Sequence, residues 1–185
     1  MARIESIRNY TPHSSDNFFF DNNVWMYIFC PIGNHDRRKQ QVYSRLFEEI
    51  MHRKATIWIN SLVLSEFFNA SMRLDYNLWK DETIKQSVSG IPSKTDYKND
   101  YRKTKRYANS VIMVNSVVKS IMALCEKSSD NFNSLEATTL LSSIKDLDFN
   151  DAYYILWSKS LSFPLKIVTD DRDFNTVEKI TIIQD

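Results

Sequence analysis

The sequence predicts an α/β fold in which helices cover both faces of a parallel sheet. Four short segments rich in β-branched and aromatic residues have the character of buried strands. Longer segments with apolar residues at helical spacing lie between them. Because helical crossovers join strands that run in the same direction, this order of elements favours a parallel sheet.

The first half of the chain contains two of these strands. Residues 18–20, F-F-F, should form a buried strand that ends at Asp21, and residues 24–29 should begin a helix. Residues 34–54 carry spaced apolar side chains among charged ones, which predicts an amphipathic helix. Residues 55–59, A-T-I-W-I, are the second expected strand.

The second half follows the same alternation around a long helical middle. Gly90 and Pro92 interrupt a polar stretch, and an extended helical segment should occupy about 80–128, with a long helix starting at Tyr97. A later helix should begin at Asp151. The remaining predicted elements are a helix at 63–74, a short helix through Leu140 and Leu141, and strands at 165–169 and 179–183.

Chain length and charge restrict the domain count and the mode of binding. At 185 residues and 21.8 kDa, the chain has the size of a single domain, which we place at residues 1–185. Its 24 Lys and Arg residues against 23 Asp and Glu residues give a net charge of +1. This balance gives no bulk attraction to nucleic acid or anionic membrane, so a polyanion would need a local basic patch.

The few glycines and cysteines exclude several classes of function. Gly33 and Gly90 are the only glycines, which excludes a Walker phosphate loop, a dinucleotide fingerprint and a G-x-S-x-G elbow. Cys30 and Cys125 lie in apolar stretches and have no zinc-ligand spacing with any histidine. The longest apolar run, residues 24–30, is too short to span a bilayer. We therefore expect a cytoplasmic protein without a membrane segment.

Acidic side chains occur at positions where they could form a site. Asp21 and the pair Asp170 and Asp171 follow predicted strands, at the edge where open α/β sheets bind ligands. Glu66 has no cation three or four residues away on its helix, so its burial would be costly without a bound cation. Asp151 opens a helix, a position that acids also favour through capping and the helix dipole.

Each of these positions also has a purely structural explanation. Glu66 could face solvent or pair with a distant Arg, and the aspartates of the D-D-R-D segment could be turn residues. As a set, however, the acids match the preference of Mg²⁺ and Mn²⁺ for carboxylate oxygens. Metal ions held in this way can support phosphodiester cleavage. The four acids of this set are Asp21, Glu66, Asp151 and Asp171.

Four blocks around these acids resemble a known family in their residues and in their order. They are F-F-F-D-N-N-V-W at 18–25, I-N-S-L-V-L-S-E-F-F-N at 59–69, D-F-N-D-A-Y-Y-I-L-W at 148–157 and K-I-V-T-D-D-R-D-F at 166–174. The ordered set resembles the PIN-domain family of metal-dependent ribonucleases. Two features depart from that family: Asn22 stands where Thr or Ser is usual, and the segment between the second and third blocks is long.

The resemblance implies a fold and a set of site residues. The fold would be a three-layer α/β/α domain with a central parallel sheet of about four to five strands. The catalytic residues and ligands for Mg²⁺ or Mn²⁺ would be Asp21, Glu66, Asp151 and Asp171, with Asp171 preferred to Asp170 because it is the second residue after Thr169. The supporting residues would be Asn23, which orients Asp21 by hydrogen bonding, Thr169, whose hydroxyl would lie behind the metal ligands, and the candidate helpers Asp148 and Asp173.

A basic segment with interleaved tyrosines lies within the long middle of the chain. Basic side chains beside aromatic rings suit single-stranded nucleic acid, because they pair with phosphates while the rings stack on bases. The alternative is an ordinary solvated helix face. The residues are Lys94, Lys98, Arg102, Lys103, Lys105 and Arg106, with Tyr97, Tyr101 and Tyr107 among them.

Three hypotheses for function remain open at this point. The first is a divalent-metal-dependent endoribonuclease that hydrolyses RNA. Resemblance to the small single-domain members implies the toxin of a type II toxin–antitoxin pair, inhibited by an antitoxin protein and forming a homodimer. The second is a catalytically inactive PIN-like module that binds RNA or a protein. The third is a metal-dependent DNA nuclease of related fold.

Overall fold

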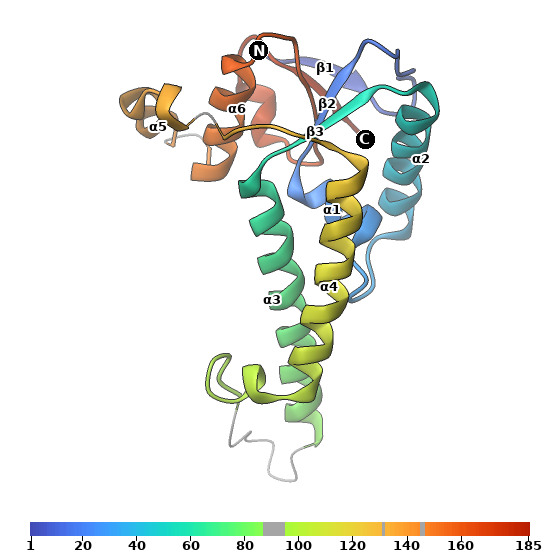
Figure 1. The fold of residues 1–185 in the computed structure, drawn as a ribbon, viewed down its shortest axis with the longest axis vertical. Helices are drawn as coiled ribbons and strands as arrows, with labels where there is room; N and C mark the ends of the chain where they lie inside the picture. The colour runs from blue at the N-terminus through green and yellow to red at the C-terminus, as the bar shows by residue number, and fades with distance from the viewer. Residues whose placement is uncertain (87–94, 131, 145–146) are drawn as a thin grey trace.

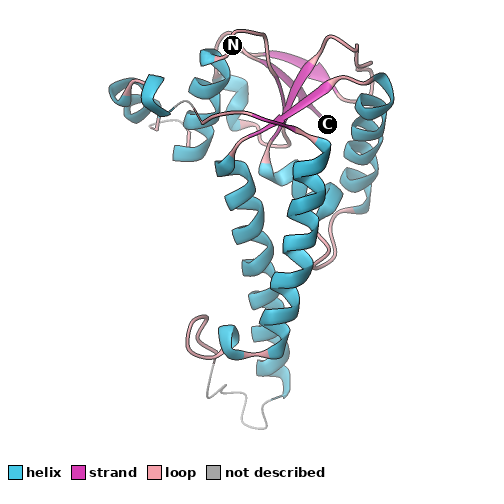
Figure 2. Ribbon diagram, in the orientation of Figure 1, coloured by secondary structure: helices cyan, strands magenta, loops and turns pink. Residues whose placement is uncertain are grey.

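The computed structural model describes residues 1–86, 95–130, 132–144 and 147–185 and confirms the α/β class. All six strands found there belong to one parallel sheet in the order β1-β6-β5-β2-β3-β4 (Figures 1 and 2). The strands are β1 (Arg3–Ser6), β2 (Asn17–Phe20), β3 (Thr56–Ile59), β4 (Glu126–Lys127), β5 (Lys166–Val168) and β6 (Thr181–Gln184).

The α-helices occupy the connections from β2 to β3, from β3 to β4 and from β4 to β5 (Figure 1). Three short 3₁₀ turns accompany them, η1 (Tyr101–Lys103), η2 (Phe132–Ser134) and η3 (Asp173–Thr176). The predicted interruption at Gly90 and Pro92 lies outside the described residues, as does Lys94. The helices are α1 (Asn22–Phe29), α2 (Arg37–Arg53), α3 (Ser61–Gln86), α4 (Lys105–Leu124), α5 (Ala137–Ser143) and α6 (Phe149–Ser160).

The sheet is larger than predicted because two strands lie at its edges. β1 has the sequence R-I-E-S and pairs only with β6. β4 is the exposed dipeptide Glu126–Lys127, which pairs with Trp58 and Ile59 of β3. Edge strands need no continuous apolar run and are often short and charged. Apolar patterning therefore identified the four inner strands and missed both edges.

The central strand β2 shows how the three layers are held together. Phe18, Phe19 and Phe20 are all fully buried, as the sequence predicts. Because successive strand residues face opposite sides of a sheet, Phe19 packs against Tyr154 and Trp157 of α6. Phe20 instead packs against aromatic side chains of α1 and α2. The aromatic core thus joins a helix layer on each face of the sheet.

Helices α3 and α4 form a long antiparallel pair that extends beyond the sheet (Figure 1). Val63, Phe67 and Met72 of α3, with Val114 and Ile121 of α4, bury the seam between them. By length and composition alone, α4 is the one helix among the described residues that could cross a membrane, and 17% of its apolar window is buried.

Two helix starts differ from the sequence-based expectation because nearby side chains cap them. The segment from residue 97 forms a turn and η1, and α4 begins only after Thr104, whose hydroxyl accepts a hydrogen bond from the amide of Tyr107 at 3.0 Å. Helix α6 begins at Phe149, because Asp148 and not Asp151 is its N-cap. Ser, Thr and Asp at this position satisfy free backbone amides of the first turn.

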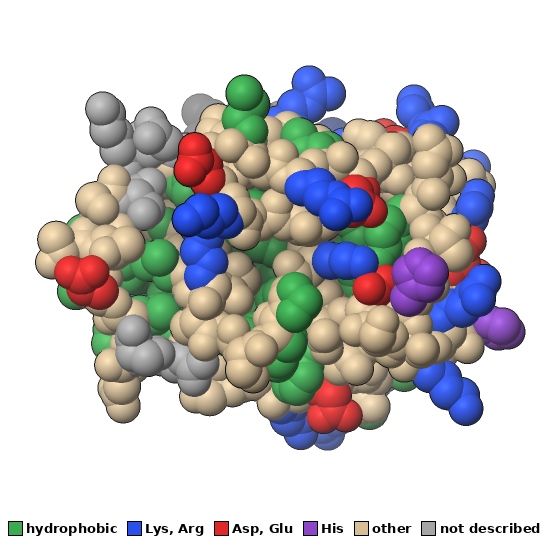
Figure 3. All heavy atoms as spheres, turned by 90° about the horizontal axis from the view of Figure 1, so that it is seen from above, with side chains coloured by type: hydrophobic (Ala, Val, Ile, Leu, Met, Phe, Trp, Pro, Cys, Tyr) green, Lys and Arg blue, Asp and Glu red, His purple; other side chains and the backbone are tan. Residues whose placement is uncertain are grey.

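Charges of both signs lie on the end of the molecule opposite the tip of the α3–α4 pair. In the view from above, which shows the face opposite the tip of the α3–α4 pair, basic and acidic side chains lie interspersed (Figure 3). This distribution agrees with the net charge of +1. Helices α1 and α3 both begin at the other edge of the sheet, where β2 and β3 end (Figure 1).

Candidate functional site

Asp21 is the most buried carboxylate of the predicted set, with 6% of its surface exposed. It directly follows β2 and is the N-cap of α1. Its oxygens accept three hydrogen bonds, from the amide of Asn22 at 2.6 Å, from Nδ2 of Asn23 at 2.7 Å and from Oγ1 of Thr169 at 2.7 Å. All three donors are neutral, so the carboxylate is oriented but its charge is not balanced by them.

Thr169 connects this carboxylate to the end of the neighbouring strand. Strands β2 and β5 pair with Phe20 opposite Val168, so the residues that follow them lie at the same edge of the sheet. The buried Oγ1 of Thr169 donates to Asp21 and accepts from the amide of Asp171 at 3.0 Å. One hydroxyl therefore positions both acidic segments.

Asn23 also connects Asp21 to the residues that follow β5. Its Nδ2 donates to Asp21, and its Oδ1 accepts from the amide of Asp170 at 3.2 Å. Asn23, which the resemblance assigns to the orientation of Asp21, donates a hydrogen bond to it, and so does the predicted supporting hydroxyl of Thr169. The neighbouring Asn22 contributes its backbone amide, while its buried Oδ1 has no hydrogen-bond partner among the described residues.

The two adjacent aspartates after β5 have different partners. The carboxylate of Asp170 forms an ion pair with Lys39 of α2 and accepts hydrogen bonds from the hydroxyls of Tyr27 and Tyr43 at 3.0 and 3.3 Å. Asp171 is half-buried, and among the described residues its Oδ1 accepts a hydrogen bond only from the amide of Asp173, at 2.9 Å. Because Asp170 already has an internal cation, Asp171 is the carboxylate better suited to bind an external one.

Glu66 of α3 faces the first turns of α6. Its carboxylate accepts hydrogen bonds from the hydroxyl of Tyr154 and from Nδ2 of Asn150. Neither of the structural alternatives for Glu66 is observed, since the side chain is half-buried and forms no ion pair with a described Arg. Burial raises the pKa of Glu66, and the two hydrogen bonds oppose that rise only in part.

Asp151 lies in the first turn of α6 without being its cap. The cap is Asp148, whose Oδ1 accepts a hydrogen bond from the Asp151 amide at 2.9 Å. The pKa of Asp151 is raised to about 8, first by burial and then by the negative charges of Asp21, Asp148, Asp171 and Glu66. The capping explanation therefore accounts for Asp148, and the carboxylate of Asp151 has no hydrogen-bond or ion-pair partner among the described residues.

Electrostatic interactions show that the four acids share one region. Burial raises the pKa of Asp21 to about 6, hydrogen bonds from Thr169 and Asn22 oppose this rise, and the charges of Glu66 and Asp171 add to it. Within the described part of the chain, none of the four forms an ion pair. Negative charges that raise the pKa values of Asp21 and Asp151 in this way favour a bound cation.

The chemistry of these donors suits a hard divalent cation, but they do not converge on one point. All four offer carboxylate oxygens, which Mg²⁺ and Mn²⁺ prefer. Across the residues described, no group of three or more His, Cys, Asp or Glu side chains could hold a metal ion as placed. Glu66 in particular is engaged by Tyr154 and Asn150. Metal binding would therefore require these side chains to adjust.

The elevated pKa of Asp151 predicts a pH-dependent stability in metal-free buffer. Its pKa lies above the unfolded value of 3.8, so the stability it contributes is complete below pH 3.8 and is lost as the pH rises toward about 8. Asp151→Asn removes this loss. After a discount for solvent screening at this half-buried site, we expect the free energy of unfolding of Asp151→Asn to exceed that of wild type by about 1–2 kcal/mol at pH 8.5. This corresponds to a melting temperature about 2–8 °C higher.

Thermal melting in EDTA between pH 5.5 and 8.5 measures this effect. The difference in melting temperature between Asp151→Asn and wild type should shrink as the pH falls. Asp173→Asn is the control, because Asp173 is exposed and its carboxylate accepts no hydrogen bond from a described residue. A gap between Asp151→Asn and wild type that stays constant over this range would contradict the assignment.

The predicted RNA-binding segment lies far along the α3–α4 pair from these acids. The side chain of Arg106 forms ion pairs with Asp75 and Glu82 of α3, which are nine and sixteen residues beyond Glu66. At 1.5 Å per residue these positions are about 14 and 24 Å along the helix. Tyr101 is fully buried and donates to Asp75 at 2.5 Å.

The residues of this segment therefore fall into two groups, those that join the helices and those that stay exposed. Arg106 and Tyr101 hold the two helices together, and the guanidinium of Arg102 lies over the ring of Tyr107 at 5.5 Å. The side chains that remain exposed to solvent are Lys98, Arg102, Lys103 and Lys105.

Sequence reasoning missed the polar side chains that hold the acids. Tyr154 and Asn150 bind Glu66 from another helix, and Lys39, Tyr27 and Tyr43 surround Asp170. The D-F-N-D-A-Y-Y block contains a signal for the first pair, because Asn150 and Tyr154 flank Asp151 within about one helical turn. No comparable pattern identifies the second group.

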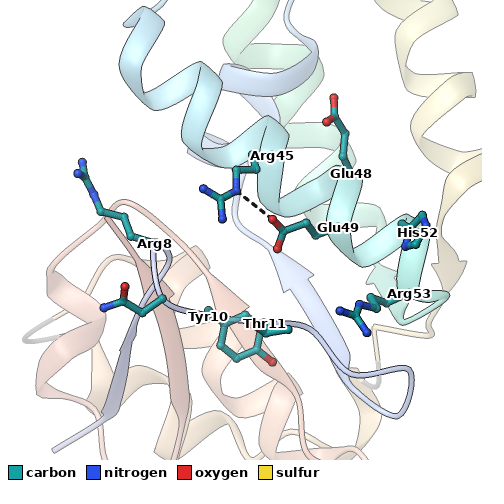
Figure 4. A pocket seen from close by; sticks show the side chains of 9 residues that line it. Arg8, Tyr10, Thr11, Arg45, Glu48, Glu49, His52 and Arg53 are labelled. Atoms are coloured by element: carbon teal, nitrogen blue, oxygen red, sulfur yellow. Dashed lines mark hydrogen bonds and ion pairs between the residues drawn. The ribbon is translucent and has the colours of Figure 1, made fainter.

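A separate surface pocket of about 530 Å³ lies between α2 and residues 8–11 (Figure 4). Its basic side chains have acidic neighbours: Arg45 pairs with Glu49 at 2.9 Å, and Arg8 pairs with Asp185 at 2.8 Å. None of the four candidate acids lines this pocket.

Comparisons with protein-family models, with curated proteins and with solved structures found no match to this chain.

Proposed function

We propose that the chain is a PIN-like, divalent-metal-dependent endoribonuclease that hydrolyses RNA phosphodiester bonds with Mg²⁺ or Mn²⁺. One observation carries this proposal. Four carboxylates from distant segments lie near one edge of a parallel sheet, where the charges of Glu66 and Asp171 raise the pKa of Asp21 and those of Asp21, Asp171 and Glu66 raise the pKa of Asp151. None of the four has an ion-pair partner among the described residues. A bound cation would remove the repulsion that this arrangement creates.

The proposed ligands are Asp21, Glu66, Asp151 and Asp171. When bound, the metal would supply an activated water and stabilise the oxygen that leaves. Asn23 and Thr169 hold Asp21 in one orientation through the two side-chain hydrogen bonds they donate to it.

The neighbours of the other ligands have supporting roles. Tyr154 and Asn150 hold Glu66 against α6. Of the two candidate helpers, Asp148 accepts a hydrogen bond from the backbone amide of Asp151. The other helper, Asp173, donates a hydrogen bond from its backbone amide to the carboxylate of Asp171. Neither helper is therefore needed as a ligand.

Cleavage of matched substrates tests this proposal. The purified protein should cut a single-stranded RNA in Mn²⁺ or Mg²⁺, should fail in EDTA, and should leave the single-stranded DNA of the same sequence intact. Cleavage of the DNA with the RNA left intact would instead support the metal-dependent DNA nuclease. Cleavage of RNA that persists in EDTA would contradict the metal dependence.

A second candidate function is an inactive module that binds RNA or a protein. The observation in its favour is that no described group of side chains is arranged as a metal site. It predicts RNA binding without cleavage under every metal condition. The same assay therefore separates the two candidates.

The proposal extends to two protein partners. By its resemblance to small toxins of this type, the chain would be neutralised by an antitoxin protein covering the acidic site and would form a homodimer. Sedimentation of the purified chain tests the dimer, and co-expression with the product of a neighbouring small open reading frame tests the antitoxin.

A further inference from the structure

An aromatic surface pocket lies beside the acidic site. It has a volume of about 400 Å³ and is formed by the starts of α3 and α6 and by η2. Phe132 and Phe149 line it with 66% and 47% of their surfaces exposed, whereas Tyr153 between them is buried. Exposed phenyl rings that frame a concave surface are typical of a binding site. We call Phe132, Tyr153 and Phe149 the aromatic ledge.

The three rings of the aromatic ledge have nearly one orientation. The centroid of the Tyr153 ring lies 6.4 Å from that of Phe132 and 6.4 Å from that of Phe149, with interplanar angles of 17° and 25°. The Tyr153 hydroxyl donates to the carbonyl oxygen of Asp130 at 2.6 Å, which fixes the middle ring. Rings held parallel to one another suit a flat aromatic ligand, because such ligands bind by stacking.

Polar atoms form the rim of the same pocket. Asp130 contributes a carboxylate, which accepts hydrogen bonds from the amide and hydroxyl of Ser61 at 3.2 and 2.5 Å. Ser65 adds a further hydroxyl on the same helix. A flat apolar surface with donors and acceptors at its edge fits a nucleobase, which has π faces and a polar edge.

The aromatic ledge is continuous with the candidate catalytic acids. Leu62 of the pocket and Glu66 of the acidic site are four residues apart on α3, which places their Cβ atoms about 5–6 Å from each other. On α6, Phe149 directly precedes Asn150, which donates to Glu66. A nucleotide whose base lies on the ledge would therefore have its phosphate near the acids.

We propose that the aromatic ledge binds a base of single-stranded RNA by stacking, next to the phosphodiester bond that is cut. This inference rests on the proposed ribonuclease function. It also specifies the substrate, because a base can reach the rings only from a single-stranded region where it is not paired.

The test is RNA binding without cleavage. Asp21→Asn serves as background, EDTA is present, and the probe is a fluorescein-labelled single-stranded oligouridylate followed by anisotropy. Phe149→Ala and Phe132→Ala should each weaken binding about 5- to 150-fold. Ile112→Ala, which removes an apolar side chain that is 68% exposed on α4, should have no effect.

A spectroscopic readout separates stacking from a structural role. An oligouridylate with one internal 2-aminopurine should lose fluorescence on binding if that base stacks on a ring. The quenching should disappear in Phe149→Ala and return in Phe149→Trp. Unchanged affinity and unchanged quenching in both alanine variants would overturn the inference, and the exposed rings would then indicate a protein partner.

The inference and the proposed function fail in different ways. Metal-dependent cleavage combined with wild-type RNA binding by the phenylalanine variants would overturn the inference and leave the ribonuclease. Phenylalanine-dependent RNA binding without metal-dependent cleavage by the unmodified protein would overturn the ribonuclease and support the base-binding pocket.

Discussion

Asp21→Asn should lower RNA cleavage by at least about 10³-fold, equivalent to about 4 kcal/mol in the activation barrier, while the fold remains intact. Asp21 is the most buried of the four acids, and three hydrogen-bond donors hold its carboxylate. The substitution removes the negative charge that would attract a metal. Asn caps a helix as well as Asp does, so α1 should keep its start. Burial disfavours the ionised carboxylate, which offsets the hydrogen bonds that the amide nitrogen of Asn cannot accept. The melting temperature of the variant checks that the fold is kept.

Asp36→Asn is the matched control for this experiment. Asp36 is the N-cap of α2 and accepts hydrogen bonds from the amides of Arg38 and Lys39. The same chemical change is thus made at the cap of the next helix, and cleavage should remain at the wild-type rate. Equal cleavage by Asp21→Asn and wild type would refute a catalytic role for the acidic site.

Asp75→Ala should destabilise the protein by about 3–5 kcal/mol and lower its melting temperature by about 6–20 °C. Asp75 is 4% exposed and binds three groups around the start of α4. Its oxygens accept from Tyr101 at 2.5 Å, from Ser110 at 2.6 Å and from Arg106 at 2.7 Å. Burial opposes ionisation of Asp75, but these contacts prevail and lower its pKa.

The size of this effect follows from what the substitution leaves behind. Without Asp75, the half-buried guanidinium of Arg106 keeps only Glu82, and the buried Tyr101 hydroxyl loses the acceptor of its hydrogen bond. Glu82→Gln is the control, because it removes the exposed partner of the same Arg106 and should cost at most about 1 kcal/mol. Thermal melting of the two variants provides the comparison. Similar melting temperatures for both would show that the buried network does not hold α3 to α4.

The inner part of the fold could be predicted from the sequence because burial leaves a pattern. Phe18, Phe19 and Phe20 indicate a strand, and the structure confirms β2 with all three side chains buried. Asp21 could be placed at the sheet edge for the same reason, since it follows that strand. The edge strands could not be predicted, because β1 and β4 bury too little apolar surface to show a pattern.

The interaction partners of individual side chains could not be predicted from the sequence. Arg106 was assigned to RNA together with its basic neighbours, yet it forms an ion pair with Asp75, 31 residues earlier in the chain. Which basic residue of a segment meets a buried acid depends on how two helices pack, and local spacing does not report this. The hydrogen bond from Tyr154 to Glu66 joins different helices and was missed for the same reason.

The central claim is that the four acids form one metal site, and thermal melting with and without metal tests it most directly. Wild type and Asp21→Asn are melted in EDTA and then in excess Mn²⁺ or Mg²⁺. Metal at 100 times its dissociation constant should stabilise the wild type by about 2.7 kcal/mol, a rise of about 5–11 °C, because it binds only the folded state. The melting temperature of Asp21→Asn should not rise when the metal is added. An equal response of the two proteins, or no response in either, would contradict the claim.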